Sequence, residues 1–270
     1  MKIVNLMEDT AGAQGCTAEH GLSFYIETPK HKILVDAGAT GQFADNAKNL
    51  GIDLRMVDIA VLSHGHYDHG NGLLRFRELS SAPIYIRRGA EADLYHVKED
   101  SVRYIGLPVE VKNLPQNVWV EGDIQIDEEL SVFTGVKGRR CWPDGNRELM
   151  RRQGGDMVQD DFGHEQYLVI SCEGENVLIS GCAHNGILNI LDCYRSLYGE
   201  NPDKVVSGFH MMKKQGLTEE DKEEIRRTAR ELSEMDTMFF TGHCTGIEAY
   251  EIMKEIMGEK LRYIHCGEVI

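Results

Sequence analysis

Residues 63–70 read SHGHYDHG, and they directly follow an apolar run at 57–62 that is typical of a buried strand. Imidazole nitrogens and carboxylate oxygens are ligands of zinc, iron and manganese. Because alternate residues of an extended loop project to the same side, His64 and His66 can bind one metal ion. Asp68 and His69 then face a second ion. Sites of α/β proteins are commonly built at strand ends, so this segment predicts a metal centre rather than a histidine-rich surface turn.

Three later segments place a histidine at the end of an expected strand. LISGCAH at 178–184 ends in His184, and FFTGHCTG at 239–246 contains His243. Six residues cannot complete two coordination spheres, so His184 and His243 are the candidates for the missing ligands. His210 in SGFH at 207–210 follows another strand end. It is a candidate for substrate binding or proton transfer.

Short β-rich runs alternate with helical patterns along most of the chain, which favours a layered α/β architecture over a helix bundle or an all-β sandwich. Strands are expected at 22–28, 31–38, 57–63, 130–134, 167–171, 176–180, 204–208, 237–241 and 261–265, and helices at 41–50, 186–198, from Thr218, and at 246–257. We expect a single domain over 1–270. Its exception is an irregular, lid-like insertion at about 135–165, because that stretch contains several glycines and no sustained period.

Composition limits the partners of this protein. The 270 residues include 44 acidic and 29 basic side chains, for a formal net charge of −15. That balance argues against nonspecific nucleic-acid binding and against docking on an anionic membrane. The start of the sequence has no signal-peptide pattern, and no apolar run reaches the roughly 18 residues that a membrane helix needs. The seven scattered cysteines never form C-x-x-C and indicate reduced thiols, so we expect a cytoplasmic location.

The histidine cluster resembles the HxHxDH signature of the metallo-β-lactamase superfamily, intact here as His64, His66, Asp68 and His69. Further segments are similar to the branch named for a dihydropterin-methyl-aminobenzene-ribofuranosyl-phosphate synthase of the methanopterin route. They are AEHGLSFYIET (18–28), ILVDAG (33–38), SHGHYDHGNGL (63–73), SGCAHNGI (180–187), SGFHM (207–211) and GHCTGIEA (242–249). The resemblance implies a four-layer αβ/βα sandwich, with two facing mixed sheets and metals in the groove at the sheet edges.

The resemblance also implies a ligand set. His64, His66 and His184 would hold one metal, and Asp68, His69 and His243 the other, with zinc as the first expectation and iron or manganese as alternatives. Many members bridge the metals with an aspartate, where this sequence has Cys182. Cys182 is therefore either a bridging thiolate or a buried filler. His164 stands where another superfamily ligand can precede a strand, or is a loop histidine. Glu19 and Asp36 are candidates for orienting the imidazoles.

Two functions of different class remain open. In a hydrolase, metal-activated water attacks a phosphoryl or carbonyl centre, and Asp68 or His210 moves the proton. In a transferase, a pyrophosphate-activated dihydropterin is joined to an aminobenzene ribofuranosyl phosphate. Similar ligands also suit a non-haem di-iron redox centre or a metal site without catalysis. The substrate is expected to be a small molecule, and the sequence does not specify an oligomeric state.

A basic segment lies inside the expected insertion. From Lys137 to Arg152 the sequence holds six basic and two acidic side chains, against the acidic trend of the whole chain. The planar guanidinium group suits phosphate or carboxylate. We therefore expect Arg139 and Arg140 to receive an anionic, phosphorylated substrate, with Trp142 as a stacking contact beside it.

Overall fold

The computed structural model describes all residues, 1–270, and its first sheet gathers the N-terminal strands. Its order is β1-β2-β3-β4-β5-β8, antiparallel from β1 to β3 and parallel from β3 to β8. The strands are β1 (Lys2–Met7), β2 (Ser23–Glu27), β3 (Lys32–Val35), β4 (Ile59–Leu62), β5 (Ile84–Arg87) and β8 (Asn117–Val120).

The second sheet gathers the C-terminal half in the order β17-β16-β15-β14-β13-β10-β9. It is parallel from β14 to β17 and antiparallel from β9 to β14, so this sheet is also mixed. The strands are β9 (Ile124–Gln125), β10 (Leu130–Thr134), β13 (Gln166–Cys172), β14 (Glu175–Ile179), β15 (Lys204–Val206), β16 (Met238–Thr241) and β17 (Leu261–Tyr263).

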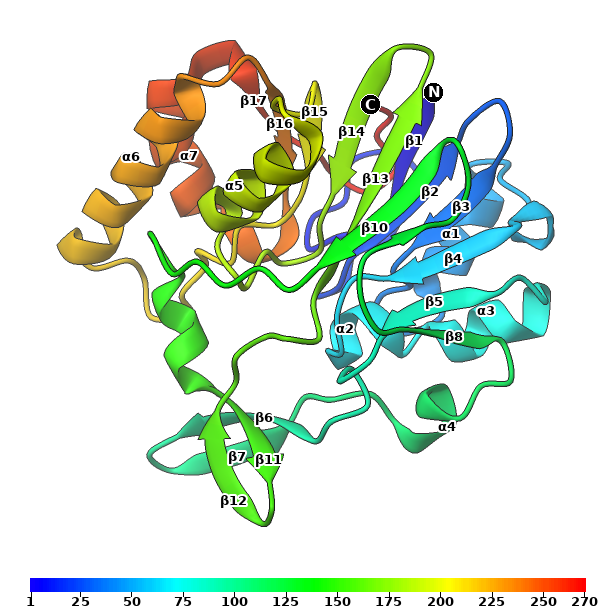
Figure 1. Cartoon of the computed structure of the whole chain (residues 1–270), viewed down its shortest axis with the longest axis horizontal. Coiled ribbons are helices and arrows are strands. Elements are labelled where there is room, and N and C mark those ends of the chain that lie inside the picture. The colour runs from blue at the N-terminus through cyan, green and yellow to red at the C-terminus, as the bar shows by residue number, and fades with distance from the viewer.

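Helices cover the outer face of each sheet (Figure 1). On the first sheet lie α1 (Gln42–Asn49), α3 (Leu73–Leu79) and α4 (Val109–Lys112), and on the second α5 (Ile187–Tyr198), α6 (Glu219–Ser233) and α7 (Ile247–Met257). The short α2 (Tyr67–Gly70) carries part of the histidine cluster, and four 3-10 turns complete the helical elements: η1 (Leu54–Met56), η2 (Asp144–Glu148), η3 (His243–Thr245) and η4 (Gly258–Lys260). None of these helices is both long and apolar enough to span a lipid bilayer.

The strand β4 shows why its sequence is apolar at every position. Ile59 and Val61 pack in the core between the two sheets, while Ala60 and Leu62 belong to the core under the helices of the first sheet. Both faces of the strand are therefore buried, which a continuous apolar run satisfies. The same alternation in the second sheet completes four layers, and the expected αβ/βα sandwich with two facing mixed sheets is confirmed.

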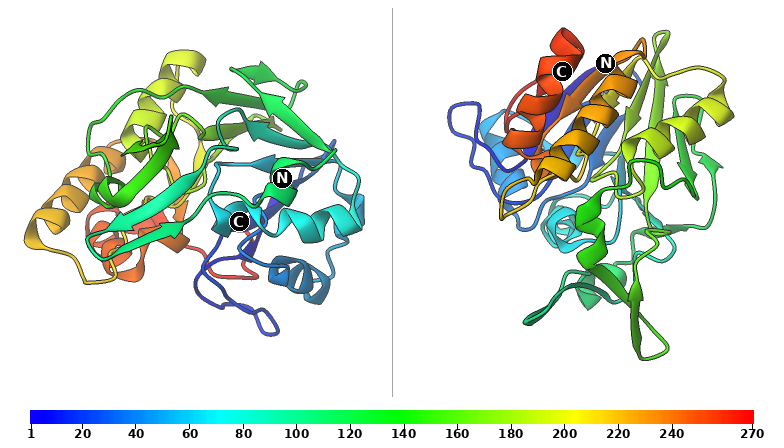
Figure 2. Two further views of the ribbon diagram at one scale, coloured as in Figure 1. Left: turned by 90° about the horizontal axis from the view of Figure 1, so that it is seen from below. Right: turned by 90° about the vertical axis from the view of Figure 1, so that its left-hand side faces the viewer.

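A third, four-stranded sheet extends from one end of the sandwich (Figures 1 and 2). Its order is β12-β11-β6-β7, formed by β6 (Leu94–Lys98), β7 (Ser101–Tyr104), β11 (Leu149–Gln153) and β12 (Asp156–Gln159). The expectation of an irregular segment at 135–165 was therefore wrong for residues 144–159, which form η2 and the β11–β12 hairpin. Gly154 and Gly155 both have positive φ and connect the paired Gln153 and Asp156, so this glycine pair was an available hairpin signal.

The expected helix from Thr218 begins as its sequence indicates. The Thr218 hydroxyl accepts from the backbone N–H of Asp221, and the Asp221 carboxylate accepts from the backbone N–H of Thr218 at 2.9 Å. This capping box satisfies two backbone donors that a helix start leaves unpaired.

Candidate metal centre

The histidines of the HxHxDH segment meet the later histidines at one edge of the two facing sheets. His64 and His66 follow β4, and His69 lies on α2. His184 follows β14 and His243 lies in η3 after β16. All five are buried. The carboxyl ends of β4, β14 and β16 thus bring together imidazoles that are far apart in the sequence.

The first set consists of His64, His66 and His184. Their candidate ligand atoms lie within 4.8 Å of one another, and His64 Nε2 is 3.0 Å from His66 Nδ1. His64 Nδ1 donates to Ser63 Oγ at 2.9 Å, and His184 Nδ1 donates to Asn146 Oδ1 at 2.8 Å. The Nε2 atoms of His64 and His184 are therefore the unprotonated nitrogens, and Nε2 of His184 has no hydrogen-bond partner.

The second set consists of Asp68, His69 and His243. His69 Nδ1 donates to Asp36 Oδ2 at 2.7 Å, and His243 Nδ1 donates to Asp9 Oδ1 at 2.5 Å. Their Nε2 atoms lie 3.9 Å and 3.5 Å from the same oxygen, Asp68 Oδ2. The second set thus has the same arrangement as the first, with an outer nitrogen held by a protein oxygen and an inner nitrogen directed to the centre.

This donor arrangement fits bound metal ions. The inner nitrogens of His184 and His243 are buried and have no hydrogen-bond partner, a situation that folded proteins rarely leave uncompensated. Imidazoles that bind metals usually donate their other N–H to a carboxylate, carbonyl or similar oxygen, which fixes the tautomer. Four of the five histidines meet that condition.

The electrostatics of the two sets differ. Burial, together with neighbouring imidazoles, holds the pKa values of His64 and His184 well below the usual range and lowers the pKa of His66 to about 3. Burial also opposes charge on His69 and His243, but adjacent carboxylates outweigh it and raise both pKa values. The first set is therefore neutral and the second is the more basic.

Cys182 lies between the two sets. Its Sγ is 3.2 Å from His69 Nε2, and it falls within 4.8 Å of ligand atoms of His64, His184 and His243 in separate groupings. The preceding Gly181 allows this approach, because a Cβ there would lie 2.2 Å from Ser63 Oγ. The single sulfur atom of Cys182 therefore lies close to ligand atoms of both sets.

Backbone strain is concentrated around the same centre. Asp36, Ala183, His210 and His243 are non-glycine residues with φ between 49° and 57°. Such left-handed conformations are costly away from glycine and cluster at functional sites.

Comparison with known proteins identifies the family of this chain. The family model of the metallo-β-lactamase superfamily matches residues 16–192, more than half of the chain. The chain belongs to the metallo-β-lactamase superfamily.

Three similar proteins align over the whole of this chain. The 7,8-dihydropterin-6-methyl-4-(beta-D-ribofuranosyl)-aminobenzene-5'-phosphate synthase of Methanocaldococcus jannaschii is 28% identical, over 100% of this chain and 96% of its own. The crystal structure of Tm1679, described as a metal-dependent hydrolase of the β-lactamase superfamily, is 30% identical, with a TM-score of 0.81 and coverage of 100% and 98%. Zinc-bound PqqB from Methylobacterium extorquens is 13% identical, with a TM-score of 0.60 and coverage of 100% and 99%, and shows the fold alone.

The sequence suggested His164 as a further ligand and Asp36 and Glu19 as groups that orient the imidazoles, and the structure places the three residues differently. His164 Nε2 is 3.0 Å from Asp160 Oδ2, and its Nδ1 accepts from the backbone N–H of Gly65 at 3.1 Å. Both nitrogens are thus occupied, and His164 supports the histidine loop. Asp36 does contact His69, whereas Glu19 accepts from the backbone of Ala39 and Thr40 and touches no imidazole.

Two residues that hold the imidazoles were not found from the sequence. Asp9 orients His243, and Asn146 orients His184 while its Nδ2 donates to the His184 carbonyl at 2.7 Å. The sequence did contain a signal for Asp9, because this residue follows the end of the apolar strand β1 almost directly. Asn146 had none, since it lies in a 3-10 turn that no local pattern connects to His184.

A cavity of about 660 Å³ lies beside His210 and is lined by none of the candidate metal ligands. His210 and Trp142 line it, together with Arg147, Lys213 and several carboxylates. The His210 ring is 4.2 Å from the His184 ring, and its buried Nδ1 has no partner. His210 therefore connects the cavity to the candidate metal centre.

The basic pair expected to receive substrate is not at this cavity. Arg140 forms ion pairs with Asp192 at 2.8 Å and with Glu231, on α5 and α6. Arg139 donates to Asn185 Oδ1 and to the carbonyls of Gly138 and Asp161, and its guanidinium lies 5.5 Å from the Trp142 ring centre. Of the four residues expected to bind substrate, Trp142 and His210 line the cavity, and Arg139 and Arg140 do not.

Proposed function

We propose that this protein is a metal-dependent hydrolase that activates water against a phosphoryl or carbonyl centre. The observation that carries the proposal is the convergence of five buried imidazoles, four of them held from outside by an oxygen, beside the cavity at His210. Two zinc ions, with iron or manganese as alternatives, would be held by His64, His66 and His184 and by Asp68, His69 and His243, with Cys182 between them. Bound ions of this kind lower the pKa of water and stabilise negative charge that develops in the transition state.

The protein's own groups supply orientation and proton transfer. Asp68 Oδ2 faces His69 and His243, and these imidazoles lower the pKa of Asp68 although burial alone would raise it. Asp68 therefore remains an anion that can align water. His210 lies between the cavity and His184 and can accept or return a proton there.

A small phosphorylated substrate is proposed for the cavity. Lys213 and Arg147 are the basic side chains at its wall and Trp142 provides an aromatic surface, beside the carboxylates of Asp144, Glu220, Asp221 and Glu224. Lys213 is held between Asp144 at 2.8 Å and Asp221 at 2.7 Å, so its ammonium group has a fixed position. The phosphate in the name of the Methanocaldococcus jannaschii relative supports the same class. The seven unpaired cysteines support a cytoplasmic location.

The experiment combines metal analysis with a substrate screen over phosphodiesters, lactones and pterin phosphates. We expect about two metal equivalents per chain and turnover of at least one class. Asp68→Asn should reduce kcat at least a hundredfold, as the loss of a proton-transfer group does, whereas the surface variant Asp192→Asn should retain it. Unchanged kcat in Asp68→Asn would refute the role of Asp68, and a metal ratio near one would refute the second metal position.

A synthase is the second candidate function. The full-length match to the dihydropterin-ribofuranosyl-aminobenzene phosphate synthase favours it. The same centre would then stabilise a departing pyrophosphate while an arylamine ribosyl phosphate attacks the activated pterin. Supplying the pyrophosphate-activated pterin with and without the arylamine acceptor separates the two functions. Acceptor-stimulated pyrophosphate release with a condensed product supports the synthase, and acceptor-independent hydrolysis supports the hydrolase.

A further inference from the structure

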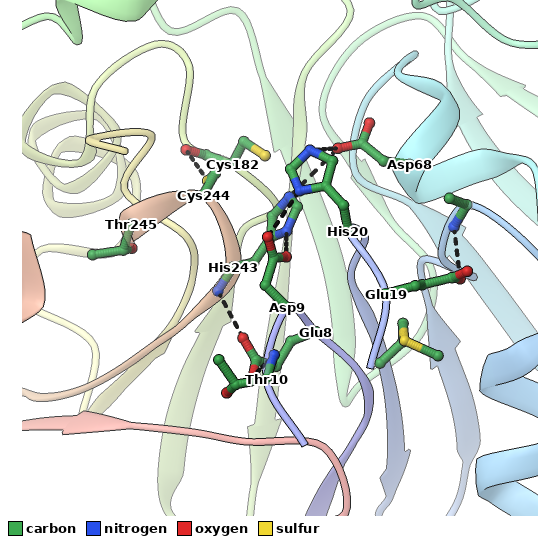
Figure 3. A network of polar contacts seen from close by, with 12 residues as sticks. Glu8, Asp9, Thr10, Glu19, His20, Asp68, Cys182, His243, Cys244 and Thr245 are labelled. Atoms are coloured by element: carbon green, nitrogen blue, oxygen red, sulfur yellow. Dashed lines mark hydrogen bonds and ion pairs between the residues drawn. The ribbon is translucent and has the colours of Figure 1, made fainter. Parts of the chain in front are cut away.

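His20 lies at the rim of the second set, on the loop that precedes β2 (Figure 3). Its Nδ1 is 2.8 Å from Asp9 Oδ2, and its Nε2 is 3.4 Å from Asp68 Oδ2. The other oxygen of Asp9 accepts from His243 Nδ1. One carboxylate thus holds two imidazoles, whose ring centres are 4.8 Å apart.

The backbone holds His20 in this place. The N–H of Leu22 donates to the carbonyl of Asp68 at 3.2 Å. A Cβ on Gly21 would lie 2.6 Å from that same carbonyl oxygen, so only glycine allows the chain to approach so closely. The loop is therefore fixed against the residue whose carboxylate His20 faces, although the His20 side chain itself is 47% exposed.

His20 repeats the arrangement of the two imidazoles already placed in the second set. Like His69 and His243, it has its Nδ1 against a carboxylate and its Nε2 directed to Asp68 Oδ2. The three Nε2 atoms lie 3.4 to 3.9 Å from that oxygen, close enough for all four atoms to surround one ion.

We infer that His20 is a further nitrogen ligand of the metal position formed by Asp68, His69 and His243. The inference rests on the metal centre of the proposed function and adds to its second position a ligand from outside the histidine cluster. The rival interpretation is a protonated His20 that forms ion pairs with Asp9 and Asp68 and never contacts the ion.

Cobalt titration distinguishes a ligand from an ion-paired histidine. The metal-free protein and its His20→Ala variant are titrated with Co²⁺, and the d–d absorption is followed for each equivalent. The matched control is His96→Ala, because His96 is on β6, pairs with Glu148 at 2.9 Å and is remote from the centre.

We expect His20→Ala to bind its first equivalent as the parent does and its second at least a hundredfold more weakly, beyond the roughly 10- to 100-fold loss seen for residues that only support a ligand. The absorption of the second equivalent should change, and added imidazole should restore both its affinity and its spectrum. Unchanged affinity and spectrum of the second equivalent, or a loss that imidazole does not restore, would overturn the inference. A parent protein that binds only one equivalent would instead refute the binuclear centre itself.

Discussion

Asp36→Asn is the perturbation that most directly tests how the metal centre is held. The Asp36 carboxylate is buried and accepts three hydrogen bonds, each of 2.7 Å. Oδ1 accepts from the backbone N–H of Ser63, and Oδ2 accepts from Ser63 Oγ and His69 Nδ1. Because Ser63 Oγ in turn accepts from His64, this one carboxylate holds an imidazole of each set.

The amide that replaces this carboxylate in Asp36→Asn would have only one accepting oxygen. If that oxygen takes the place of Oδ2, the amide NH₂ faces the N–H of Ser63. If it takes the place of Oδ1, the NH₂ faces the donors of Ser63 and His69. At least one hydrogen bond to a charged group is lost in either orientation, which costs about 1.5–3 kcal/mol of unfolding free energy. Weaker support of both imidazoles should reduce metal affinity about 10- to 100-fold, or about 1.4–2.7 kcal/mol.

The assay is competition with a chromophoric chelator for each metal equivalent, together with thermal unfolding of the metal-free protein. Asp53→Asn is the control, since Asp53 is exposed and pairs only with the nearby Arg55. We expect wild-type affinity in the control and reduced affinity for both equivalents in Asp36→Asn. Parent-like affinity for both equivalents in Asp36→Asn would refute the idea that this carboxylate holds the ligands.

Three further predictions concern acid, packing and charge. Metal binding needs neutral imidazoles, and the pKa values are raised for His69 and His243 but lowered for the first set, to about 3 for His66. Acidification should therefore release the second metal equivalent first, as metal content after dialysis at decreasing pH would show; simultaneous release would contradict this. Gly181→Ala should lower the free energy of unfolding by about 1–3 kcal/mol through overpacking and reduce metal content, because the added Cβ would meet Ser63 and His64. Gly122→Ala is the control, since a Cβ there would meet nothing within 4 Å. Equal melting temperatures of the two variants would contradict this prediction. Lys213→Ala should raise KM for an anionic substrate about tenfold or more, because Lys213 lines the cavity, whereas Arg140→Ala should not, because Arg140 lies outside it. Steady-state kinetics over a salt series would reveal the opposite order if the cavity assignment is wrong.

The sequence by itself determined a layered α/β architecture and the histidine cluster of this site. The apolar run of β4 required cover on both faces, and the histidines that follow β4, β14 and β16 all come from strand ends. Parallel strands end at the same edge of a sheet, so this local pattern was enough to mark His184 and His243 as candidate ligands. The grouping of the imidazoles into two metal positions came from the resemblance to the superfamily. The capping box at Thr218 is local in the same sense, since its partners are three residues apart.

Only the tertiary structure decided what holds the imidazoles and where positive charge is available. Asp9 and His243 are 234 positions apart, and Asn146 and His184 are 38 apart, in segments with no shared pattern. The basic segment around Arg140 looked free in the sequence, but folding places Asp192 and Glu231 against it. Hydrogen bonds and ion pairs depend on distances of a few ångströms between side chains. Those distances are set by how α5, α6 and the loop after β1 pack on the sheets, which composition and spacing along the chain do not encode.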